Sequence, residues 1–210
     1  MRTRIKVFTA PTVEPVTLIE SKEHLRRTDT REDDYITTLI IAAREYIEAQ
    51  TRRALINQTL DLAMDRFPTS GEYGYSDQTS LDRSSQFLLP RPPLSSITSI
   101  TYVDTAGTSQ TLSASTYNAD TYSEPGRVYL SHGSTWPSTR TIENAVIVRY
   151  VAGYGATAAS VPAALKHAIK LVVAHWFLNR ESVLVGTISK ELERTLNSLI
   201  WQYKDYRVPV

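Results

Sequence analysis

The sequence contains no cysteine, and its 210 residues carry almost no excess of charge. The absence of cysteine excludes disulfide bonds, thiolate metal sites and cysteine nucleophiles. With 23 basic and 22 acidic side chains, the formal net charge is +1, which is unlike a protein selected chiefly to bind nucleic acid. No apolar run approaches the roughly 18 residues that cross a bilayer, so we expect no membrane partner.

Motifs for catalysis and for cofactor binding are also missing. None of the four histidines belongs to a His-Glu-x-x-His run, and His167 and His175 lie about two helical turns apart, too far to share a metal ion. Gly153-Tyr-Gly155 precedes a helical pattern, but neither Gly-Lys-Ser/Thr nor a third glycine follows to bind phosphate. Gly-x-Ser-x-Gly, the nucleophile elbow, does not occur. We therefore expect no enzyme, no cofactor and no metal.

One long amphipathic helix over 32–53 is the clearest local signal. Seven apolar residues recur at helical spacing and form one stripe: Tyr35, Ile36, Leu39, Ile40, Ala43, Tyr46 and Ile47. Four charged residues are expected elsewhere around the helix: Arg44, Glu45, Glu48 and Arg52. Acidic residues in the first turn and the Arg52-Arg53 pair in the last turn interact favourably with the helix dipole.

Other helices are predicted on both sides of a central region. Thr17-Leu-Ile-Glu20 matches a capping box, which predicts a short helix ending near Arg27. Pro162 suits the first turn of a helix whose wide apolar face runs to Phe177. A final helix is expected from Leu192 to Tyr203, where leucines recur at helical spacing.

The central region has the signature of strands and turns. Leu60, Leu62 and Met64 alternate with polar or small residues, which is typical of a half-buried strand. The segment 144–151 is rich in valine and isoleucine at both parities, which predicts a strand buried on both faces. Between these strands, 68–85 is rich in Ser, Gly and Thr and is predicted to be a long surface loop.

These patterns together predict an α+β fold. We expect an α-helical bundle of about four helices, with a mostly antiparallel β insertion between the second and third long helical segments. The predicted division is an extended N-terminal arm at 1–16, a helical core at 17–58 and 157–206, a β-rich insertion at 59–156, and a C-terminal tail at 207–210.

The order of several short motifs resembles a known family. The motifs are Thr17–Leu25, Asp33–Thr59, Leu89-Pro-Arg-Pro-Pro leading into Thr101–Asp104, Ser123-Glu-Pro-Gly-Arg127, Trp136-Pro137, Val151-Ala-Gly-Tyr-Gly155 and Val161–Glu181. In this order they resemble the head–tail connector (adaptor) proteins of long-tailed double-stranded DNA phages and of gene transfer agents, in the longer form with a β insertion. The resemblance covers nearly the whole chain beyond the first 15 residues.

The resemblance implies a structural subunit of the virion neck. Such a subunit would be made in the bacterial host cytoplasm and would form a ring of twelve copies below the portal protein. The ring would complete the head, extend the DNA channel without reading the DNA sequence, and dock the next connector, stopper or tail-completion protein. A closed ring requires two different complementary faces on each subunit. The segment 61–156 (six basic, nine acidic residues) and the segment 157–210 (seven basic, four acidic) could supply them.

Three groups of residues are candidates for contacts within the particle. Trp201, Tyr203, Tyr206 and Arg207 form an aromatic C-terminal group that we predict docks on the portal, because aromatic residues are favoured at interface hot spots. The alternative is that Trp201 only completes the core of the subunit. Tyr73 and Tyr75 mark the loop as a second interface. Arg26, Arg27, Arg52 and Arg53 are candidates for weak contacts with DNA phosphates.

Two functions from other classes remain open at this stage. A non-specific DNA-binding module would bind duplex DNA with an affinity that falls as the salt concentration rises. A small hydrolase would need a cluster of catalytic side chains, which the spacing of the histidines does not supply.

Overall fold

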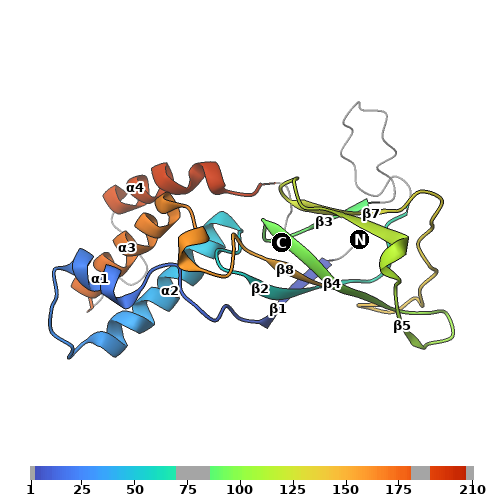
Figure 1. Cartoon of the computed structure of the whole chain (residues 1–210), viewed down its shortest axis with the longest axis horizontal. Coiled ribbons are helices and arrows are strands. Elements are labelled where there is room, and N and C mark those ends of the chain that lie inside the picture. The colour runs from blue at the N-terminus through green and yellow to red at the C-terminus, as the bar shows by residue number, and fades with distance from the viewer. Residues whose placement is uncertain (1–2, 70–85, 181–189, 207–210) are drawn as a thin grey trace. The chain divides into compact units, whose positions relative to one another are not determined.

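The computed structural model describes residues 3–69, 86–180 and 190–206 (Figure 1). The chain divides into two compact units. The described residues of the first, here called the β unit, lie within Met1–Ala10, Asn57–Gly153 and Tyr206–Val210. Those of the second, the helical unit, lie within Pro11–Ile56 and Tyr154–Asp205. Helices and antiparallel strands thus occupy separate parts of the chain, which confirms the predicted α+β class.

The helical unit contains every α-helix found among the described residues. These helices are α1 (Leu18–Leu25), α2 (Asp33–Thr51), α3 (Ala163–Leu178) and α4 (Lys190–Ile200). Two short 3₁₀ helices belong to the same unit: η2 (Ala158–Ser160) and η3 (Trp201–Tyr203).

Local sequence explains where these helices begin and end. The predicted capping box is present at α1, because the Glu20 amide donates to Thr17 Oγ1 at 3.1 Å and the Thr17 amide donates to Glu20 Oε2 at 2.8 Å. Asp33 and Asp34 lie in the first turn of α2, as expected from the helix dipole. Arg52 follows α2 in the left-handed conformation (φ 57°) and ends the helix.

The helices share one apolar core. Its fully buried members come mainly from α2 and α3, with Leu196 and Ile200 from α4. Two aromatic pairs join α2 to α3 at its edge: the Tyr35 and Phe177 ring centroids are 6.2 Å apart, and those of Tyr46 and Trp176 are 5.9 Å apart. The apolar stripe predicted for α2 therefore packs as expected.

Two charged residues outside the apolar stripe of α2 are nevertheless buried. Arg44 and Glu48 are buried, with exposed fractions of 6% and 5%. Arg44 Nη1 donates to Glu48 Oε2 at 3.0 Å, and Arg44 Nε donates to Glu14 Oε2 at 2.8 Å. A spacing of four residues places Arg44 and Glu48 on the same helix face. Burial becomes possible because Glu14, from the segment before α1, supplies a second carboxylate.

The β unit contains two antiparallel sheets. The five-stranded sheet has the order β1-β2-β8-β4-β5, and its strands are β1 (Thr3–Thr9), β2 (Gln58–Met64), β8 (Val146–Ala152), β4 (Leu94–Val103) and β5 (Ser109–Thr111). The three-stranded sheet has the order β3-β7-β6, and its strands are β3 (Gln86–Leu89), β7 (Gly126–Leu130) and β6 (Tyr117–Asp120). A 3₁₀ helix, η1 (Ala114–Thr116), precedes β6.

Strand β8 lies in the centre of its sheet, but only one of its faces is buried. Val146, Val148 and Tyr150 are fully buried, whereas the side chain between the first two, Ile147, is 37% exposed. The prediction of burial on both faces was therefore wrong. Composition alone is misleading here because β-branched residues favour a strand on either face, and an antiparallel sheet can leave one face in water.

The N-terminal segment differs from the expected extended arm. Residues 3–9 form β1, which pairs with β2 so that Ile5 lies opposite Leu62 and Lys6 opposite Asp61. The alternation of Arg4 and Lys6 with Ile5 and Val7 is compatible with a strand. It forms one because β2 offers its free edge, a long-range pairing that local sequence cannot reveal.

The two sheets of the β unit pack against each other. Gly126 of β7 lies so close to Leu94 of β4 that a Cβ atom at this position would come within 2.5 Å of the leucine Cβ. Only glycine therefore allows the sheets this approach. Among the described residues, no helix has the length and hydropathy to cross a membrane.

Candidate interaction surfaces

The C-terminal aromatic residues differ in exposure. Trp201 is 65% exposed at the start of η3, so the alternative that it only completes the core is wrong. Tyr203 is half-buried and packs against the core of the helical unit. Tyr206 is 76% exposed and is assigned to the β unit. Arg207 lies outside the described residues, as do the loop candidates Tyr73 and Tyr75.

The four arginines proposed for DNA contacts have different environments. Arg26 and Arg52 are exposed, and each adopts the left-handed conformation directly after a helix. Arg27 is also exposed but pairs with Glu32 at 2.8 Å. Arg53 is buried, and its Nε donates to the carbonyl oxygen of Tyr203. In this conformation Arg53 joins the end of α2 to η3 and does not present its charge to solvent.

A further exposed aromatic residue has no counterpart among the sequence-based candidates. Tyr122 lies in the turn between β6 and β7 and is 99% exposed. Composition gave no reason to prefer it among the 12 tyrosines. The run Tyr-Ser-Glu-Pro-Gly predicted a turn, but not that the tyrosine ring would be almost fully exposed.

The turn that carries Tyr122 is held by Asp120. One carboxylate oxygen accepts from the amides of Tyr122 at 3.0 Å and Ser123 at 3.1 Å, and the other accepts from the Ser123 hydroxyl at 2.5 Å and from Arg127 Nε at 3.2 Å. Burial opposes ionisation of this carboxyl, but these hydrogen bonds and Arg127 outweigh it and lower its pKa. A fixed turn with a projecting aromatic ring is well suited to anchor a partner.

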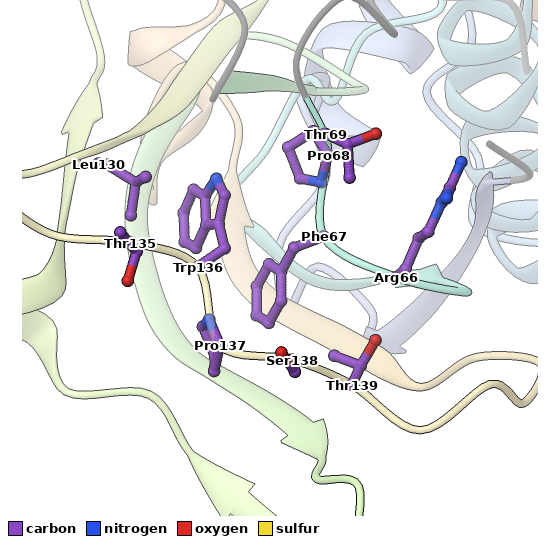
Figure 2. Close-up of a pocket in the computed structure, with 10 residues that line it drawn as sticks. All are labelled: Arg66, Phe67, Pro68, Thr69, Leu130, Thr135, Trp136, Pro137, Ser138 and Thr139. Atoms are coloured by element: carbon purple, nitrogen blue, oxygen red, sulfur yellow. The ribbon is translucent and has the colours of Figure 1, made fainter.

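The β unit also contains a recess lined by aromatic and small polar side chains (Figure 2). Its volume is about 510 Å³. Phe67 and Trp136 stack beside it with centroids 4.8 Å apart, and Figure 2 shows Arg66 extending away from this pair. The described side chains that line it include no carboxylate, histidine or lysine. These described side chains form no acid–base pair.

Two of the histidines meet in the helical unit. His24 of α1 and His167 of α3 form an edge-to-face pair with ring centroids 6.1 Å apart. Burial lowers the pKa of His24, and the nearby His167 and Lys170 lower it further. Within the described part of the chain, no group of three or more His, Asp or Glu side chains is arranged to hold a metal ion.

Comparison with known proteins identifies the family. A family model described as head completion protein matches residues 15–191. The chain belongs to the head completion protein family. The family resemblance found in the sequence is thereby confirmed, and with it a structural role at the head–tail connector. No curated protein sequence matches this head completion protein.

Solved structures share its fold. One is the neck of an empty gene transfer agent particle with C6 symmetry, with 22% sequence identity and a TM-score of 0.73. A second is the virion of a native gene transfer agent particle, with 23% identity and a TM-score of 0.72. A third is the neck of a native particle with C12 symmetry, with 24% identity and a TM-score of 0.67. Each alignment covers 98% of this head completion protein and 97% of the other chain.

Proposed function

We propose that this head completion protein forms a closed ring of twelve copies at the neck of a tailed phage or phage-like particle. The ring docks below the portal protein, extends the DNA channel and receives the next connector, stopper or tail-completion protein. The observation that carries this proposal is the family match over 15–191. It is supported by structures of similar fold, two of which are necks of gene transfer agent particles with C6 and C12 symmetry.

In this arrangement the helical unit and the β unit have different structural roles. The helical unit forms the connector core, and the β unit carries interaction surfaces of its own. Trp201, with Tyr203 and Tyr206, anchors the subunit to the portal, and Tyr122 is an additional anchor on the β unit. Large exposed aromatic side chains bury much area at small entropic cost, which makes them effective anchors.

DNA is proposed to pass through the ring without being held. Of the four candidate arginines, Arg26, Arg27 and Arg52 have exposed side chains that are able to approach phosphates. Phosphate contacts carry no base sequence information. The near-neutral charge of the chain also suits a conduit, because tight phosphate binding would retain the DNA as it moves. The protein performs no catalysis in this role.

Particles produced without this protein test the proposal. We expect DNA-filled heads that lose their DNA and carry no tails, with both defects restored by the wild-type chain supplied in trans. Electron microscopy of restored particles should place the added density between portal and tail. Tailed, stable particles assembled in its absence would contradict the proposal.

The C-terminal docking site has a separate test. Deletion of residues 204–210 should abolish attachment to portal-bearing heads, while circular dichroism shows an intact fold. Attachment at the wild-type level would refute this docking site without affecting the proposed ring.

The alternative of a non-specific DNA-binding module makes a different prediction. Such a module would bind duplex DNA at low salt and lose affinity steeply on raising the ionic strength. We expect only weak binding at both ionic strengths. Tight, strongly salt-dependent binding by the isolated protein would favour the alternative.

A further inference from the structure

Helix α2 carries an exposed stripe that is acidic and apolar. Asp34, Ile41 and Glu45 define this acidic stripe, and their spacing of seven and four residues places them on one helix face. Asp34 and Glu45 are exposed, and the apolar side chain between them, Ile41, is 39% exposed. The other residues of the same face, such as Thr38 and Ala42, are uncharged.

Helix α3 carries a partly exposed stripe with basic residues, of which His167 is exposed and Lys170 half-buried. His167, Lys170 and Leu178 define this basic stripe, and their spacing of three and eight residues again places them on one face. Leu178 is 78% exposed, a large value for a leucine in a helix. Ala163 and Ala174 lie on the same face, so the stripe contains no acidic residue.

The two stripes face away from each other. Helices α2 and α3 pack together in the helical unit (Figure 1) and direct Ile40, Ile47, Leu165 and Ile169 into one core. Each exposed stripe lies on the side of its helix opposite to these buried residues. One subunit therefore presents two different surfaces in two directions, as a heterologous ring interface requires.

Charges along the acidic stripe are incompletely compensated within the subunit. Arg44 is the cation nearest to Glu45, at 3.5 Å, but it also pairs with Glu14 and Glu48. Three carboxylates thus share one guanidinium. Within the described part of the chain, the Asp34 carboxylate has no ion-pair partner.

The basic stripe has a positive charge that is not compensated within the described part of the subunit. Among the described residues, Lys170 forms no ion pair, whereas the neighbouring Lys166 pairs with Glu20 at 2.8 Å. His24 of α1 packs edge-to-face against His167 at the edge of this stripe, and its lowered pKa favours the neutral imidazole there. The Lys170 ammonium therefore gains Coulomb attraction when carboxylates of another subunit approach.

We infer that the acidic stripe of one copy packs against the basic stripe of the next copy in the ring. This inference rests on the proposed ring and names the surfaces that close it. Ile41 and Leu178 supply the apolar contact, and the charges fix which surfaces meet. A second copy is the occupant because the complementary surface is already present on the chain itself.

Cross-linking in assembled particles tests this contact directly. The chain has no cysteine, so Ile41→Cys combined with Leu178→Cys introduces the only thiols. A short bis-maleimide linker should convert this variant into a ladder of covalent oligomers. Ile19→Cys with Leu178→Cys is the matched control, because Ile19 is 70% exposed on α1 but outside the acidic stripe. An equal ladder in the control, or none in the test variant, would overturn the inference.

Charge reversal provides an independent measurement. Asp34→Lys with Glu45→Lys should reduce incorporation into necks by roughly tenfold or more, since like charges then face each other. Combination with His167→Glu and Lys170→Glu in the same chain should restore incorporation. Glu191→Lys with Glu193→Lys, an equal charge change on exposed positions of α4, should leave incorporation unchanged.

The outcomes separate this inference from the proposed function. Wild-type incorporation of the reversed variants, or failure of the combined variant to recover although thermal unfolding shows it folded, would overturn the stripe contact and leave the neck role intact. Absence of the wild-type chain from the neck would overturn the proposed function itself. If charge reversal prevents folding, the cross-linking pair, which alters no charge, decides.

Discussion

Arg44 and Glu48 form an ion pair within the core of the helical unit, with 3.0 Å between Nη1 and Oε2. The carboxylate of Glu48 also accepts from the Leu55 amide at 2.8 Å through its other oxygen. The pair therefore connects the middle of α2 to the segment that follows the helix. A buried pair of this kind is costly to break, because removal of one partner weakens the compensation of the other buried charge.

We predict that Glu48→Ala lowers the free energy of unfolding by about 3–5 kcal/mol. The substitution leaves Arg44 with its remaining partners and the Leu55 amide without its acceptor. Urea denaturation at neutral pH measures the change. Glu45→Ala is the control, since the Glu45 side chain is 66% exposed, and it should change stability by no more than about 0.5 kcal/mol. Equal losses for the two variants would contradict the structural role of Glu48.

The capping box at α1 predicts a pH dependence. Burial opposes ionisation of Glu20, but the hydrogen bonds from Lys166 and Thr17 outweigh it and lower the pKa of this carboxyl below its ordinary value of 4.5. The unfolded chain therefore binds this proton more readily than the folded chain does. Stability from this group is complete above about pH 4.5 and falls as the pH decreases through the folded pKa.

Glu20→Gln isolates this contribution. Glutamine can still accept at the N-terminus of α1 but does not titrate. We expect the free energy of unfolding of the variant to fall less steeply than that of the wild type between about pH 4.5 and pH 3. Identical slopes in acid denaturation experiments would show that Glu20 has the same pKa in both states.

Removal of one hydroxyl tests the packing of the β unit. Tyr150 is fully buried, burial raises the pKa of its phenol, and its hydroxyl donates to the carbonyl oxygen of Pro90 at 2.7 Å. Tyr150→Phe should lower the free energy of unfolding by about 1–3 kcal/mol, because the carbonyl loses its partner. Tyr129→Phe, at a position 42% exposed, should have almost no effect. If Tyr150→Phe left the free energy of unfolding unchanged, the carbonyl oxygen of Pro90 would have to accept a hydrogen bond from water instead.

The substitution Trp201→Ala tests whether this side chain belongs to an interface or to the core of the subunit. Because its side chain is 65% exposed, Trp201→Ala should change the free energy of unfolding by no more than about 0.5 kcal/mol. Attachment to portal-bearing heads should nevertheless fall strongly, as expected for an aromatic anchor. Denaturation and a pull-down with heads measure the two effects. A large loss of stability with unchanged attachment would reverse this assignment.

Several features could be predicted from sequence because they depend on neighbours along the chain. The capping box of Thr17 and Glu20 lies within four residues, and the apolar stripe of α2 follows the helical period directly. Alternation at Leu60, Leu62 and Met64 predicted β2 for the same reason. The family was recognisable because the motifs occur in a characteristic order.

Other features depend on which distant segments meet. Arg44 was placed outside the apolar stripe of α2, but Glu14 reaches it from 30 residues away and makes its burial possible. Arg53 was a candidate for phosphate contact, yet Tyr203, 150 residues further along the chain, holds it in the interior. Exposure of Trp201 and Tyr122 could not be read from composition, because an aromatic ring in a sequence has the same hydrophobicity in a core and at an interface.

The sequence by itself determined the α+β class, the positions of most helices and strands, and the head completion family, because periodicity and motif order are local properties of the chain. Only the tertiary structure decided that Ile41 and Leu178 are exposed on opposite sides of a shared core and that β1 pairs with β2. The physical reason is that burial and strand pairing are set by long-range packing, which local sequence constrains but does not specify.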